Sequence, residues 1–145
     1  MASALNKGFM SNAGFVVTSD GVVVYDALGT PALGEAMRVA IRKVTAQPIR
    51  RIVVGHYHAD HIYGLQALLA PGVPIFAHRK AEAYLQSGQS VERLAQRRAE
   101  LFPWVDDKTR VVPPTDWLDG DTSFKLGGLT FRMIHAGSAH SPEDL

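Results

Sequence analysis

The short apolar run Ile52 to Val54 is followed, after Gly55, by His56-Tyr57-His58-Ala59-Asp60-His61, which places four potential metal ligands within six residues. Such a short apolar run is typical of a strand buried on both faces. Side chains alternate along an extended segment, so His56, His58 and Asp60 can point the same way, and a turn at His61 can bring in a fourth ligand. Imidazole and carboxylate ligands together favour zinc, iron or manganese over calcium or magnesium. The chain is therefore expected to hold a metal site at the end of a buried strand.

The residues before this strand alternate between strand and helix patterns. Segments 14–18 and 22–25 flank an Asp-Gly step, which predicts an antiparallel hairpin. Apolar residues then recur at helical spacing from Leu33 to Val44, with Thr30 as the expected cap and Pro31 at the first position. A helix followed by a buried strand predicts a crossover packed on a sheet.

The residues after the histidine cluster predict further short elements. Helices are expected over 65–70, 79–86 and 90–102, a strand over 73–77, and a hairpin of strands 122–126 and 129–134. In the helix over 90–102, one apolar stripe is expected to comprise Val91, Leu94, Ala95, Leu101 and Phe102. Prolines predict a loop after this helix, containing Trp104 and Trp117. The fold class is α/β, with helices layered on a mixed sheet.

Composition sets broad limits on the protein. With 145 residues, of which 46% are hydrophobic and 20% charged, one globular domain over 1–145 is expected. The net charge of +1 gives no electrostatic reason to expect a nucleic-acid partner, and Arg93, Arg97 and Arg98 are read as the solvated face of a helix. The absence of cysteine excludes disulfides and thiolate ligands.

No stretch of about 18 apolar residues is present to span a membrane, and residues 1–7 contain no apolar signal core. A soluble protein without a membrane partner is expected. Its compartment is cytoplasmic by default, or periplasmic if a signal peptide has been removed.

The motif His56-x-His58-x-Asp60-His61 resembles the signature of the metallo-β-lactamase superfamily. The strand ending at Asp26 is similar to an early strand of that family, which closes on a structural Asp. The segment from His135 to Pro142 looks like a later family loop, in which a histidine, here His140, completes the first metal site. The resemblance covers about residues 8 to 145.

The resemblance implies a layered αβ/βα fold, and it predicts that this chain is a truncated form with only the first αβ half. It assigns His56, His58 and His140 to one metal ion, and Asp60 and His61 to a second. The bridging Asp and final His of the family's second site find no match here. Two zinc ions are expected in the intact protein, with iron or manganese as alternatives. Asp26 is not expected to bind the metal itself. It is expected to hold a ligand imidazole or the loop backbone in position.

Three functions are consistent with these residues. The leading one is a hydrolase of small molecules, in which a metal-bound hydroxide, oriented by Asp60, attacks an ester, thioester, lactam or phosphodiester. The second is an oxidoreductase of persulfide dioxygenase type with a single iron ion. The third is a catalytically inactive fragment with a partial metal site.

A first half alone is expected to leave one apolar sheet face uncovered, which monomers rarely tolerate. A homodimer that covers this face is therefore predicted.

Overall fold

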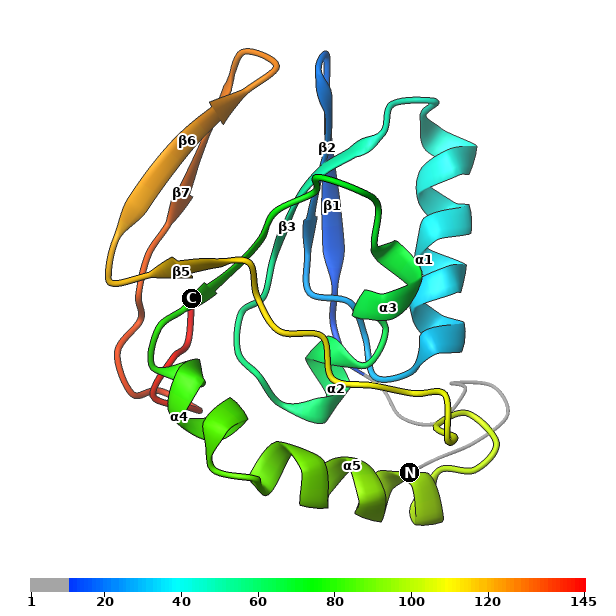
Figure 1. The fold of residues 1–145 in the computed structure, drawn as a ribbon. Helices are drawn as coiled ribbons and strands as arrows, with labels where there is room; N and C mark the ends of the chain where they lie inside the picture. Colours follow the sequence, from blue (N-terminus) through cyan, green and yellow to red (C-terminus); the bar gives the residue numbers. More distant parts are fainter. Residues whose placement is uncertain (1–10) are drawn as a thin grey trace.

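A mixed five-stranded sheet forms the centre of the protein, whose computed structural model describes residues 11–145; the N-terminal segment 1–7 discussed above lies outside the described residues. The strands occur in the order β1 (Gly14–Thr18), β2 (Gly21–Tyr25), β3 (Ile49–Val53), β4 (Ile75–His78) and β5 (Asp116–Leu118) (Figure 1). β1 pairs with β2 in antiparallel register, and the three other pairs are parallel. The predicted α/β class and the N-terminal hairpin are therefore confirmed.

Helices connect the parallel strands. They are α1 (Pro31–Val44), α2 (Ala59–Ile62), α3 (Leu65–Leu68), α4 (Ala81–Gln86) and α5 (Gln89–Glu100). α1 begins as predicted, because the hydroxyl of Thr30 accepts a hydrogen bond of 3.2 Å from the backbone N–H of Leu33, and Pro31 occupies the first turn. No helix in the described part of the chain is both long and apolar enough to cross a membrane.

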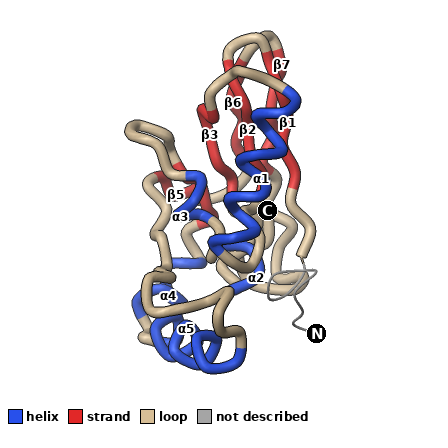
Figure 2. The backbone as a smooth tube through the Cα atoms, turned by 90° about the vertical axis from the view of Figure 1, so that its right-hand side faces the viewer, coloured by secondary structure: helices blue, strands red, loops and turns tan. Residues whose placement is uncertain are grey.

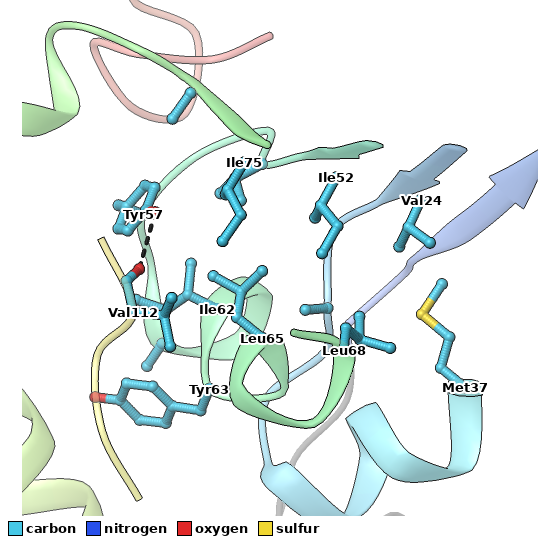
Figure 3. Close-up of a cluster of buried hydrophobic side chains, with 14 of the residues drawn as sticks. Val24, Met37, Ile52, Tyr57, Ile62, Tyr63, Leu65, Leu68, Ile75 and Val112 are labelled. Atoms are coloured by element: carbon cyan, nitrogen blue, oxygen red, sulfur yellow. Dashed lines mark hydrogen bonds between the residues drawn. The ribbon is translucent and has the colours of Figure 1, made fainter. Parts of the chain in front are cut away.

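The main core lies between the sheet and these helices. Val24, Ile52 and Ile75 project from three neighbouring strands and are almost completely buried. They face Met37 of α1 and the side chains of α3 (Figure 3). Because alternate strand residues point to one face, the buried residues of β2 and β3 divide between this core and a second cluster on the other face.

A separate hairpin covers part of that second face. It consists of β6 (Thr122–Leu126) and β7 (Leu129–Met133), which were predicted, and it lies across the sheet from α1 (Figure 1). Met133 and Phe124 pack with Val23 and Val53, and the guanidinium of Arg51 lies 4.5 Å from the ring centre of Phe124. The face that was expected to be bare is thus partly covered by the chain itself.

Two expectations about residues 90–118 were wrong. The stripe on α5 is narrower than predicted: Leu94 and Leu101 are buried, but Val91 and Phe102 are 69% and 72% exposed. The stretch expected to be a loop also contains β5, and Trp117 lies in that strand opposite Ala77. β5 has three residues, too few to display an alternating pattern, and its pairing with β4 defines it.

Candidate metal centre

The histidine motif lies where β3 ends and α2 begins, at the carboxyl end of a central parallel strand. Its residues alternate between core and site: Tyr57, Ala59 and Ile62 are at most 5% exposed. The Tyr57 hydroxyl donates a hydrogen bond of 3.0 Å to the carbonyl of Val112 (Figure 3). These buried residues anchor the backbone, so the side chains between them must project to the other side. Both Tyr57 and Tyr63 are fully buried and belong to the main core.

Two imidazoles of the motif converge with a third from a distant segment. His56, His58 and His140 each offer a ring nitrogen, and these nitrogens lie within 4.8 Å of one another. Nδ1 of His58 and Nε2 of His140 are 3.0 Å apart. His140 comes from the segment after β7, far from the motif in sequence. The structure therefore brings together the three residues assigned above to one ion.

Asp144 holds the His140 segment in place. Its carboxylate accepts hydrogen bonds from the backbone N–H groups of His140 (2.5 Å) and Ser141 (2.8 Å) and from the Ser141 hydroxyl (2.6 Å). It also lies 3.6 Å from Nδ1 of His56. Burial disfavours its charge, but these hydrogen bonds outweigh burial and lower the pKa of Asp144 to about 2. The sequence analysis did not predict this role of Asp144. The spacing Ser141-x-x-Asp144, which is typical of a turn, could have indicated it.

Asp60 and His61 form a second group of potential ligands. Nε2 of His61 lies 3.4 Å from a carboxylate oxygen of Asp60, and its ring centre is 4.1 Å from that of His56. The pKa of Asp60 is lowered, because its interaction with His61 outweighs the opposing effect of burial. His61 thus lies close to His56, and Asp60 lines the same pocket as His58 and His140.

Asp26 lies behind this group and is 2% exposed. One carboxylate oxygen accepts a hydrogen bond of 2.7 Å from Nδ1 of His61, and the other accepts one of 2.8 Å from the backbone N–H of Gly55. Burial opposes the charge on His61, but Asp26 and Asp60 outweigh it and raise the pKa of His61 to about 9. With Nδ1 bound to Asp26, Nε2 of His61 is the nitrogen directed toward Asp60.

The backbone around Asp26 is unusual. Asp26 and Leu28 have positive φ angles of 60° and 67°, a region that residues other than glycine rarely adopt. Backbone hydrogen bonds maintain this conformation: the N–H of Asp26 donates to Val53, and the N–H of Ala27 donates to the carbonyl of His61, both at 2.9 Å. The loop that carries Asp26 is thereby tied to the motif helix.

The donor set fits a metal ion. Burial, reinforced by the neighbouring histidines, lowers the pKa values of His56 and His58, so both rings are neutral at pH 7 and have a nitrogen lone pair for a metal. Nε2 of His56 is buried and has no hydrogen-bond partner among the described residues. A buried nitrogen of this kind normally has a partner, and a metal ion is one that suits neutral imidazole.

A pocket of about 420 Å³ opens beside the imidazoles. Its lining comprises His58, Ala59, Asp60, Tyr84, Gln89, Arg93, Arg97 and His140. Arg93 is exposed, in agreement with the predicted solvated face, whereas Arg97 and Arg98 are partly buried. Arg93 and Arg97 line the pocket, whereas Arg98 donates hydrogen bonds of 2.7 and 2.6 Å to the carbonyls of Asp106 and Thr109.

Two other histidines lie outside the cluster. His78 and His135 stack with their ring centres 3.9 Å apart, and Nε2 of His135 lies 2.9 Å from the carbonyl of Pro142. They connect the end of β4 to the segment that carries His140. Their contacts agree with a structural role.

The fold and the site together define a class: an α/β protein with a histidine-rich candidate metal centre at the carboxyl ends of parallel strands. Residues 6–145 match the model of the family described as the metallo-beta-lactamase superfamily, and the chain belongs to that family.

Solved structures with this fold include several enzymes. The sec-alkylsulfatase Pisa1 from Pseudomonas sp. is 17% identical with a TM-score of 0.68, and the match covers 97% of this chain and 26% of that one. A metallo-beta-lactamase from Pontibacter korlensis is 21% identical with a TM-score of 0.68, covering 91% and 52%. A HARLDQ-motif mutant of the metallo-beta-lactamase from Cronobacter sakazakii is 25% identical with a TM-score of 0.66, covering 91% and 50%. The chain thus spans about half the length of these lactamases and about a quarter of the alkylsulfatase.

Proposed function

We propose that the protein is a metal-dependent hydrolase that cleaves an ester, thioester, lactam or phosphodiester. The observation that carries this proposal is the convergence of His56, His58 and His140, with the orphaned Nε2 of His56 buried among them. Three imidazole ligands leave further coordination positions open, which is the pattern of a catalytic rather than a structural zinc site. The family membership supports the same class of chemistry.

In this proposal His56, His58 and His140 hold one zinc ion, and Asp60 and His61 contribute to a second. Bound zinc lowers the pKa of water toward neutrality and polarises the bond under attack. The chain's own residues position the reactants. The carboxylate of Asp60 accepts a hydrogen bond from the attacking water and so orients it. Asp26 holds the proton on Nδ1 of His61, so Nε2 is the nitrogen that would give up its proton to bind a metal ion.

A small-molecule substrate is part of the proposal. The solved neighbours are named for alkyl sulfates and β-lactams, which are both small molecules. The pocket of about 420 Å³ is of a size that suits ligands of this kind.

The test combines metal analysis with turnover. We expect zinc in the purified protein, and zinc-dependent hydrolysis of a generic aryl ester or phosphodiester that chelation abolishes and zinc restores. The variant His58→Ala should lose both metal and activity, whereas the matched surface variant Arg42→Gln on α1 should keep both. If the protein instead contains about one iron per chain and consumes oxygen with a persulfide substrate, the hydrolase proposal is wrong and the oxidoreductase alternative holds. A zinc-loaded protein without turnover would mean a catalytically inactive chain.

We also propose a homodimer. An apolar groove of about 360 Å³ runs between the sheet and the β6–β7 hairpin, and it includes Val16, Tyr25 and Ile134, which are 43 to 50% exposed. A second copy that covers this groove would remove these side chains from water. Light scattering at micromolar concentration should give twice the chain mass, and a monomer would overturn the proposal.

A further inference from the structure

One wall of the pocket beside the imidazoles is built from hydrogen-bond donors. α5 contributes Gln89, Arg93 and Arg97, and α4 contributes Tyr84. In both views α4 and α5 lie together at the end of the molecule far from the β6–β7 turn (Figures 1 and 2), and α2, which carries Asp60, lies between them and the sheet in Figure 1. We call these four residues the donor wall. It faces the same pocket as His58, Asp60 and His140.

The spacing of the donor wall explains why it forms one surface. Gln89, Arg93 and Arg97 are four residues apart, so they follow one another along a single side of the helix. Each has N–H groups that donate to oxygen, and the guanidinium forks match the two oxygens of a carboxylate, sulfate or phosphate. Tyr84 adds a hydroxyl.

The lining of this pocket contains more positive than negative side chains. Two arginines line this pocket, and the only carboxylate in its lining is that of Asp60, on the side of the candidate metal ligands. On α5 itself, Glu100 pairs with Arg97 at 2.6 Å, and Glu92 faces a neighbouring pocket that Arg93 also lines. Arg98 differs from both wall arginines, because its guanidinium binds backbone carbonyls and has a structural role.

We propose that the donor wall binds an anionic group of the substrate, a carboxylate, sulfate or phosphate, while the bond to be cleaved lies at the imidazoles. The inference rests on the proposed hydrolase function and narrows it: the enzyme prefers substrates with an oxyanion at a distance from the scissile bond. Arg93 is then a specificity-determining residue. Its exposed position on the helix means that it can be replaced without opening the core.

The first experiment compares two aryl esters of the same length. The zinc-loaded protein is given the p-nitrophenyl monoester of glutaric acid, whose far end is a carboxylate, and p-nitrophenyl valerate, whose far end is a methyl group. The preference for the glutarate ester is the ratio of the two kcat/KM values. Arg93→Gln should lower this ratio about tenfold through KM, as expected for one lost charge-assisted pair. Arg42→Gln, which removes an arginine outside the pocket, should leave the ratio unchanged.

The second experiment does not depend on hydrolysis. The dissociation constant of inorganic sulfate is measured for the metal-free protein by calorimetry or chemical-shift titration. Arg93→Gln should weaken sulfate binding about tenfold, and Arg42→Gln should not. If neither ester is cleaved, the hydrolase proposal fails. The sulfate titration still tests whether the donor wall binds an anion. Sulfate binding and an ester ratio that both stay within about twofold in Arg93→Gln would overturn the inference.

Discussion

The carboxylate of Asp26 lies 2.7 Å from Nδ1 of His61, and its other oxygen accepts the backbone N–H of Gly55. One buried side chain therefore determines both the orientation of a potential metal ligand and the backbone at which the histidine motif starts. This relationship links the loop after β2 to the chemistry expected at the end of β3.

Replacing Asp26 by Asn should weaken the second metal site selectively. The amide nitrogen of Asn would donate toward Nδ1 of His61, so Nε2 would carry the proton and lose its lone pair for a metal. We expect the affinity for a second zinc equivalent to fall about 10- to 100-fold while the first equivalent is retained. Zinc titration monitored by calorimetry measures both, with the exposed Asp107→Asn as control. Equal loss of the two equivalents would contradict this role.

The three imidazoles should act as one site. His56→Ala, His58→Ala and His140→Ala should each remove one metal equivalent, because a site with two remaining imidazoles lacks the ligands that a zinc ion requires. His135→Gln should retain that equivalent, because its amide can still donate to the Pro142 carbonyl. Metal content after dialysis, measured by mass spectrometry, tests this prediction. Retention of both metals in His140→Ala would remove that residue from the ligand set.

The charge on His61 should stabilise the metal-free protein below neutral pH. Its pKa is raised from 6.5 to about 9 by Asp26 and Asp60 against the effect of burial, so this stabilisation is complete below pH 6.5 and disappears as the pH rises through 9. The difference in free energy of unfolding between the chelator-treated wild type and His61→Gln should be larger at pH 6 than at pH 10, by about 1 to 3 kcal/mol. Urea denaturation at both pH values measures it. A difference that grew with pH would refute the assignment.

Gly64 should tolerate no side chain. A Cβ at this position would lie 1.8 Å from the carbonyl oxygen of Ala27 and 3.0 Å from the Cα of Gly34. Gly64→Ala is expected to destabilise the protein by about 1 to 3 kcal/mol, because the Asp26 loop and α1 would both have to move. Gly120→Ala, where no atom lies within 4 Å, is the matched control. The two midpoints of chemical denaturation give the comparison.

Local signals made the motif and the early elements predictable. The hairpin of β1 and β2 follows from an Asp-Gly turn, and α1 follows from Thr30, Pro31 and a regular apolar stripe. The four potential ligands of the motif lie within six residues, so their spacing alone predicted a metal site. Family resemblance was needed for His140, since nothing local distinguishes it from a solvated loop histidine.

The remaining features depend on contacts between distant segments. The role of Asp144 arises only once its segment is beside His56, and β5 exists only through its pairing with β4. The apolar stripe predicted for α5 was wider than the buried one, because this helix packs on the core mainly through Leu94. The helical pattern of α5 predicted a solvated arginine face, but it does not reveal that a pocket lies beside this helix. These features depend on tertiary contacts, which cannot be predicted from composition or periodicity alone.

The alternation of buried and ligand residues in the motif has a thermodynamic consequence. Tyr57 and Ile62 are fully buried in the core. The rings of His56 and His58 therefore lose most of their conformational entropy when the chain folds, and not when a metal ion binds. The site is therefore preorganised, and binding requires little additional ordering of the protein. Core mutations that loosen Tyr57 should then lower metal affinity without altering any ligand.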